Sequence, residues 1–356
     1  MGSTAVILGL LLLITVIADA LQTVIVARHA RSLPRMTRLF YHLTWVPFAA
    51  LAQFIRPGRR REHYLGLYGP LSLLMLLGLW ALGLIVSFAL LRWAAGPRFE
   101  VSPSDFLDAI YSSARTFFTL GSGEPQYPLA KFLLVAEAGL GFTFLGLVIG
   151  YLPVLYQSYS SRELRILVLD ARAGSPPSAF EFLSRVGTDP NRLEQRLANW
   201  EEWALDLLQC HLSYPMLAYY RSQHPNQSWL SALTTIVDVS AVVMVSATDE
   251  LKRQAEFTFA AGPHALAHTA SIFHRQPSAS YENRLDAREF SRLCAAISEG
   301  HAPLRADGIS EAALQTIRTT YEPHAIALGR YFMMAVPSFV PETASSANWQ
   351  AQSWDA

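Results

Sequence analysis

Two glycines separated by one residue end a threonine-rich stretch, TFFTLGSGE, that runs from Thr116 to Glu124. Gly121 and Gly123 come after a plausible helix and before a strongly hydrophobic segment. Glycine adopts left-handed backbone conformations at little steric cost, so alternate glycines allow successive carbonyl oxygens to point the same way. Such carbonyls can replace the hydration shell of a cation. The candidate cation-binding residues are Thr119, Leu120, Gly121, Ser122 and Gly123.

The residues before this stretch predict a short helix. Ser102 is a typical helix cap, Pro103 suits the first helical position, and Asp105 follows three residues after the cap. We expect the helix to run to about Phe118, which is too short to cross a bilayer. Non-helical backbone at membrane depth survives only where it lines a water-filled path, and the negative end of the helix favours a cation there.

The composition narrows the class of protein. The chain has 356 residues, a formal net charge of zero and a positive mean hydropathy, which excludes a disordered or nucleic-acid-binding chain as a whole. Apolar residues concentrate before about residue 157, and the remainder has the composition of a soluble protein. Cys210 and Cys294 have no metal-ligand spacing, so we expect buried, reduced thiols.

Three segments are expected to span a membrane. Leu65–Leu91 contains no charged residue and exceeds the roughly 20 apolar residues that a bilayer core needs. Leu129–Gln157 is the second span, although it contains Glu137. Thr4–Ala27 is the third and is interrupted only by Asp19, which is a functional candidate because a lone acid in a span is costly.

The N-terminal segment has an alternative interpretation as a cleaved signal peptide, because Ala18, Asp19 and Ala20 resemble a signal-peptidase site. The residues that precede the apolar run include no Lys or Arg, and the run resumes after Asp19. These two features favour a retained helix.

Two arginine clusters predict the orientation in the membrane. One cluster follows the span Thr4–Ala27 and contains Arg28, Arg31, Arg35 and Arg38. The other precedes the span Leu65–Leu91 and contains Arg56, Arg59, Arg60 and Arg61. By the positive-inside rule both clusters are cytoplasmic. Leu39–Ile55 lies between them and begins and ends on the same side, so we expect a helix in the membrane interface. The N-terminus would then be outside and the soluble part cytoplasmic.

The fold class predicted is an all-α membrane protein. The expected domains are residues 1–64 (an N-terminal transmembrane helix and a basic interfacial segment), 65–157 (a module of two spans and a re-entrant segment), 158–340 (a helical domain) and 341–356 (a disordered tail). In the helical domain, Asp189 and Pro190 predict a helix start. Further helices are predicted near Trp229–Ala247, Arg284–Ser298 and Glu311–Met334.

Trp229–Ala247 is apolar almost all round, which also fits a fourth span. Asp238, several Ser and Thr residues and the lack of a flanking basic cluster favour a central helix of a soluble bundle.

Taken together, these features resemble the potassium-channel family of pore-loop tetramers, in the form with an outer helix, a pore helix and an inner helix. That family's filter reads T, two residues, T, a small apolar residue, G, an aromatic, G, D. The corresponding residues here are Thr116, Thr119, Leu120, Gly121, Ser122, Gly123 and Glu124. The resemblance covers about Leu65–Tyr156, roughly a quarter of the chain.

The resemblance implies a passive, K⁺-conducting channel, formed by a homotetramer in the plasma (inner) membrane. Membrane lipid would surround it, monovalent cations would permeate it, and it would have no enzymatic activity and no cofactor. The glycines after residue 158 form no GxGxxG motif, which the nucleotide-binding domains of many relatives carry. The gating ligand is therefore unknown.

Ser122 departs from the family pattern, because it stands where the family has an aromatic that holds the filter's width. The alternative is therefore a non-selective Na⁺/K⁺ channel, and from another class a non-conducting, membrane-anchored sensor. Thr116, Arg115, Glu124 and Glu137 are expected to support the filter. Arg115 lies behind the filter and is expected to pair with Glu124 or with Glu137.

Two further sets of residues are candidates. In the inner helix of the family a glycine or proline forms the bend of the gate, which implies a hinge among Gly141, Gly146, Gly150 and Pro153. His264 and His268 are four residues apart, and His274 follows. Such a pair can ligate a metal, but the lack of a nearby Cys or of an acid at ligand spacing favours partly buried structural histidines.

Overall fold

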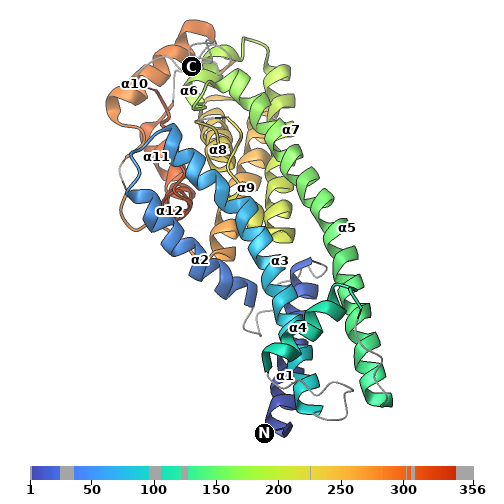
Figure 1. Cartoon of the computed structure of the whole chain (residues 1–356). Coiled ribbons are helices and arrows are strands. Elements are labelled where there is room, and N and C mark those ends of the chain that lie inside the picture. The colour runs from blue at the N-terminus through green and yellow to red at the C-terminus, as the bar shows by residue number, and fades with distance from the viewer. Residues whose placement is uncertain are drawn as a thin grey trace, which may run out of the picture. The chain divides into compact units, whose positions relative to one another are not determined.

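The computed structural model describes residues 2–24, 36–95, 106–121, 127–224, 226–281, 283–301, 303–305 and 309–341 (Figure 1). These residues form helices, turns and loops, and no β-strand occurs among them. The chain divides into two compact units. The first unit comprises Met1–Arg56 and Leu67–Gln157, and the second comprises Pro57–Gly66 and Ser158–Ala356.

The first unit contains the helices predicted to span. They are α1 (Gly2–Val24), α2 (Met36–Gln53), most of α3 (Arg59–Ala95), the short α4 (Phe106–Phe117) and the first part of α5 (Pro128–Ala173). Helices α1, α3 and α5 are long and apolar enough to cross a membrane. The residues expected to cap α4, Ser102 to Asp105, lie outside the described residues, as do Arg28, Arg31 and Arg35.

Both α3 and α5 are longer than the predicted spans. Helix α5 was expected to end at Gln157, where the hydropathy falls, yet it continues to Ala173. Ile166, Leu169 and Ala173 repeat at helical spacing and are buried. The extension is therefore an amphipathic helix that belongs to the second unit. The change in composition marks the end of the apolar stretch without ending the helix.

Asp19 joins the first three helices inside the first unit. Its carboxylate is buried and accepts hydrogen bonds from Trp80 Nε1 on α3 (2.9 Å), Thr37 Oγ1 (2.6 Å) and the Thr37 backbone N–H (3.2 Å). Thr37 lies in the first turn of α2, so the carboxylate caps that helix. Helix α1 also approaches α3 closely, because a Cβ added to Gly83 would lie 2.7 Å from Val16 Cγ2. Asp19 thus has a structural role between helices.

Helix α2 has one packed face and one exposed apolar face. Trp45 is buried with its ring centroid 4.8 Å from that of Tyr68, and Thr44 Oγ1 shares a 2.8 Å hydrogen bond with the Tyr68 hydroxyl. The exposed face contains Leu39, Leu43, Val46 and Leu51. This segment is the helix that the sequence predicted, and its position in the membrane interface remains a prediction.

The second unit is a helical bundle. After the α5 extension come α6 (Ala179–Arg185), α7 (Pro190–Ser213), η2 (Pro215–Tyr219), α8 (Trp229–Ser246), α9 (Asp249–Ile272), α10 (Ala287–Ala296), η3 (Ile297–His301), α11 (Glu311–Arg318) and α12 (Glu322–Phe332). Asp189 caps α7 by accepting from the Asn191 N–H (3.1 Å), as predicted. Helix α9 was not predicted.

Two helices replace the single one expected over Glu311–Met334. Helix α11 ends at Arg318, and Pro323 occupies the first turn of α12. Proline has no N–H for an interior helical hydrogen bond but suits a helix start, which explains the break. The predicted tail beyond Pro341 lies outside the described residues.

Helix α8 is enclosed by its own unit. It lies beside α9 (Figure 1), and 89% of its 18-residue apolar window is buried. Its single acid, Asp238, pairs with Arg284 (Nη2–Oδ2, 2.5 Å) and accepts a hydrogen bond from the Tyr321 hydroxyl (2.6 Å). Arg284 Nη1 also lies 3.0 Å from Glu322 Oε1. A polar core of this kind supports the interpretation of α8 as a central bundle helix.

Arg221 contacts both the start of α3 and the extension of α5, within the second unit. Its guanidinium lies 3.4 Å from Glu62, in the first turn of α3, and donates to the Met333 carbonyl after α12 (3.1 Å). The Tyr159 hydroxyl on the α5 extension donates to the Arg221 carbonyl (3.1 Å). One turn further along α5, Arg162 donates to the Tyr220 carbonyl (3.0 Å). The start of α3 and the end of α5 are thus held by the same short segment.

His211 on α7 is fully buried in this unit. Its ring packs edge-on against Trp229 at 4.6 Å, and Nδ1 lies 3.4 Å from Thr269 Oγ1. Nε2 has no hydrogen-bond partner among the described residues. Burial, and secondarily the positive charge of Arg162, lower the pKa of His211 to about 3 from 6.5.

The depressed pKa of His211 predicts acid sensitivity of the second unit. The unfolded chain binds a proton at this site below about pH 6.5 and the folded chain does not, so the free energy of unfolding falls on acidification by up to ~1.4 kcal/mol per pH unit. The melting temperature of the full chain in detergent, measured from pH 7.5 to pH 5, should decrease. The non-titrating His211→Asn variant should lack this component, and exposed His264→Asn is the matched control. If the melting temperature falls equally with pH in wild type and in His211→Asn, the acid sensitivity does not come from His211.

Candidate functional site

The backbone after α4 turns into the predicted cation-binding stretch through left-handed residues. The Thr119 N–H donates to the Thr116 carbonyl (3.0 Å) and the Leu120 N–H to the Arg115 carbonyl (2.8 Å), a pair of bonds that ends a helix in a Schellman motif. Thr119 has φ 57° and Gly121 has φ 88°. Gly121 therefore adopts the conformation expected of it.

The left-handed conformation of Thr119 was not expected. A β-branched residue rarely has a positive φ, because its Cβ crowds the backbone. Strained residues of this kind persist where the surrounding structure holds them, and they cluster at functional sites. Leu120 is 71% exposed. Ser122, Gly123 and Glu124, the rest of the predicted filter, lie outside the described residues.

One face of α4 is polar and buried against α3 and α5. Arg92, near the end of α3, donates from Nη1 to Ser112 Oγ (3.0 Å) and from Nη2 to Thr116 Oγ1 (2.8 Å). The same guanidinium forms an ion pair with Glu137 on α5, and the Ser113 hydroxyl also donates to that carboxylate. We call these five residues the clamp. It connects all three helices through buried hydrogen bonds.

The clamp corrects the predicted partner of Glu137. Glu137 is fully buried and pairs with Arg92, whereas Arg115 is exposed and places its guanidinium over the Tyr111 ring at 5.8 Å. Arg115 points away because the buried face of α4 is occupied by Ser112, Ser113 and Thr116. Pairing of Arg115 with Glu124 falls outside the described residues.

Arg92 was missed from the sequence although a signal was present. The uncharged run was read as ending at Leu91, and Arg92 is the next residue. An arginine at the end of one span and a lone acid, Glu137, inside the next form a plausible buried pair, because isolated charges at membrane depth are costly. Ser112 and Thr116 are four residues apart, so their hydroxyls lie on one face of α4. Such a polar face would have supported a buried pair of Arg92 and Glu137.

Gly141, one of the glycines considered for a gate hinge, is packed against the end of α4, and a hinge there remains a prediction. A Cβ at Gly141 would collide with the Phe117 carbonyl oxygen and lie 2.9 Å from its carbonyl carbon. The end of α4 therefore rests directly on α5. Gly146 and Gly150 have nothing within 4 Å of such a Cβ, and α5 continues as a helix through Pro153. A hinge at these three positions remains a prediction.

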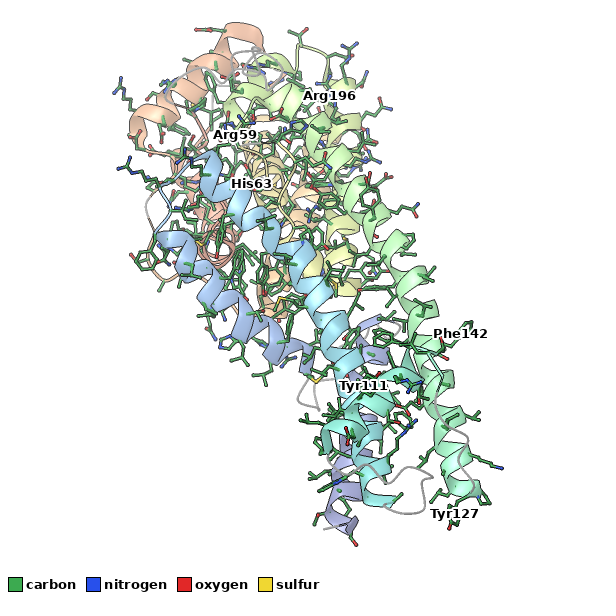
Figure 2. All side chains as sticks on the ribbon, in the orientation of Figure 1. Arg59, His63, Tyr111, Tyr127, Phe142 and Arg196 are labelled. Atoms are coloured by element: carbon green, nitrogen blue, oxygen red, sulfur yellow. The ribbon has the colours of Figure 1, made fainter. Side chains whose placement is uncertain are left out.

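Helix α5 exposes a continuous apolar face. Only 11% of its most apolar window is buried, and the exposed positions repeat at helical spacing: Val135, Phe142, Leu145, Ile149 and Tyr156. Phe142, 72% exposed, projects from α5, and Tyr111, 66% exposed, lies on α4 (Figure 2). An apolar face of this length is suited to lipid or to another copy of the chain.

The histidine pair lies elsewhere, on α9 of the second unit. His264 and His268 are exposed, and their ring centroids are 4.3 Å apart. Within the described ranges no three His, Cys, Asp or Glu side chains group together as metal ligands. The expectation of partly buried structural histidines is not met, since both rings reach the surface. Cys210 and Cys294 are free and partly buried.

A comparison with models of protein families finds a match over part of this chain. Residues 74–157 match a protein-family model described as an ion channel, so α3, α4 and α5 contain an ion-channel module in an all-helical integral membrane protein. The family model that matches describes a potassium-channel-like pore module with two transmembrane helices. Neither a curated protein nor a solved structure matches the chain.

The contact at Gly141 gives a direct test of the packing. Gly141→Ala should lower the free energy of unfolding by ~1–3 kcal/mol, the usual effect of overpacking, because the new methyl group displaces the end of α4. Gly139→Ala, two residues away on the same helix, is the matched control, because an added Cβ there meets nothing within 4 Å. Thermal unfolding of the purified full chain measures both, and equal melting temperatures would show that α4 does not rest on α5.

Proposed function

We propose that the protein is a passive cation channel that conducts K⁺ through a homotetrameric pore. The observation that supports this most strongly is the backbone between α4 and α5. A short helix ends at Phe117, and two left-handed residues, Thr119 and Gly121, follow it between two membrane-competent helices. Carbonyl oxygens arranged in this way can coordinate a dehydrated cation.

The orientation of α4 adds electrostatic support. The C-terminal end of a helix carries a partial negative charge, and α4 ends directly at the proposed filter, Thr119 to Gly123. In this proposal four copies of that stretch line one axis and provide the permeant-cation sites. Thr116 and Glu137 support the filter through the clamp.

The exposed face of α5 supports assembly from several copies. One chain leaves this face uncovered, and a pore formed by carbonyls needs oxygens from several directions. Ion channels of this type are typically multimeric. Four subunits, the plasma membrane and a cytoplasmic second unit belong to the proposal, the last because of the arginine clusters. In this proposal the protein is not an enzyme, it binds membrane lipid, and its gating ligand is unidentified.

Ser122 favours a second candidate, a channel that passes Na⁺ and K⁺ alike. Its small side chain offers little to pack around the filter. A membrane-anchored sensor that does not conduct is the remaining alternative. Ion flux through the purified protein distinguishes the sensor from both channel proposals.

Gly121→Ala tests conduction. An alanine at φ 88° is strained, so the filter should not form and the K⁺ flux into liposomes should fall to background. Gly78→Ala is the matched control, because a Cβ at this helical glycine of α3 meets nothing within 4 Å. Unchanged flux in Gly121→Ala would refute the proposed filter.

Ser122→Tyr tests the origin of selectivity. If the small side chain weakens discrimination, a tyrosine at this position should increase the permeability of K⁺ relative to Na⁺. The measurement is the reversal potential with K⁺ on one side of the membrane and Na⁺ on the other. An unchanged ratio would mean that Ser122 does not limit selectivity.

A further inference from the structure

The clamp holds one face of α4 from two directions. Arg92 belongs to α3 and Glu137 to α5, and these side chains are 4% and 0% exposed. The Ser113 hydroxyl adds a contact with the Ile85 carbonyl on α3 (2.7 Å). Each contact restricts the rotation of α4 about its axis and its translation along that axis.

Thr116 transmits this restraint to the proposed filter. Its hydroxyl accepts from Arg92, while its own backbone carbonyl accepts from the Thr119 N–H (3.0 Å). The next bond of the helix end joins the Leu120 N–H to the Arg115 carbonyl (2.8 Å). One residue therefore connects the buried ion pair with the first residues of the filter through two consecutive hydrogen bonds.

The helix end has a second fixed point at Gly141. The Phe117 carbonyl lies against this glycine, so the last turn of α4 cannot move toward α5. The clamp and this contact lie on consecutive residues, Thr116 and Phe117. Together they fix where the backbone leaves the helix, and hence where the strained residue Thr119 begins the filter.

Selection between cations depends on where the coordinating oxygens lie and on how many can reach the ion. A small displacement of the backbone at Thr119 changes the positions of the carbonyl oxygens that follow it and the number of them that can reach the ion. The clamp restrains the backbone where the filter begins, because Thr116 bonds both to Arg92 and to the Thr119 N–H.

We propose that the clamp is a specificity-determining element: by positioning Thr116 it sets the geometry of Thr119 to Gly121 and so the preference for K⁺ over Na⁺. This inference rests on the proposed cation-channel function. Arg92, Thr116 and Glu137 act through the backbone and are positioning residues. None of them contacts the permeating ion.

Thr116→Val is the sharpest test, because it removes one hydroxyl and keeps the shape of the side chain. The purified full chain is reconstituted in liposomes, with K⁺ on one side and Na⁺ on the other. The permeability ratio should fall at least about tenfold, which corresponds to ~1.4 kcal/mol of lost discrimination, while the oligomer elutes unchanged from a sizing column. Lys131→Gln, an exposed change of charge on α5, is the matched control and should retain the ratio.

A purely structural clamp would give a different pattern: less assembled protein, but an unaltered ratio in the oligomers that remain. That result would overturn the inference. If Thr116→Val does not assemble, Ser112→Ala removes a peripheral contact of the same clamp and should lower the ratio by a smaller factor. A wild-type protein that conducts without preference would also overturn the inference but leave the channel function intact, whereas wild-type protein without flux would refute the channel function itself.

Discussion

The ion pair between Arg92 and Glu137 is the interaction on which the arrangement of the first unit depends. Removing one partner of a buried pair typically costs about 3–5 kcal/mol, because the other charge stays buried without compensation. Here both partners also bind hydroxyls of α4, so the pair determines the position of a third helix. Lipid cannot replace these hydrogen bonds, since hydrocarbon offers neither donors nor acceptors. The polar residues in the first unit therefore specify the packing that apolar side chains alone would leave undefined.

Asp19 shows the same physical principle at the other end of this unit. A carboxylate in an apolar helix is tolerated because Trp80 and Thr37 supply donors. Close helix contact at Gly83 brings these groups within reach. In the second unit, Asp238 has an equivalent function with Arg284 and Tyr321. In each case an acid within an apolar helix marks the place where that helix meets its neighbours.

Much of the fold was predictable, because apolar runs and caps are local signals. The spans of α1, α3 and α5, the cap at Asp189 and the helical class all followed from the sequence. The length of α5 did not, because Ile166 and Leu169 are buried only when the second unit, to which they belong, has folded. In the site, the left-handed Gly121 followed from its residue type. For the partner of Glu137 the sequence held only a weak signal, Arg92 at the end of the preceding apolar run, because the three polar residues of α4 become its neighbours only through tertiary packing. Thr119 carries no local signal for its positive φ.

The contacts of Arg221 have a mechanical consequence. Helix α3 begins and α5 ends in the second unit, and both are continuous helices into the first. A helix transmits rotation and axial force along its length far better than a flexible linker does. Because Glu62 and Tyr159 both contact Arg221, a shift of this one residue would displace the first turn of α3 and the Tyr159 region of α5 together within the second unit. The segment after η2 thus holds two helices that are almost a hundred residues apart in the sequence.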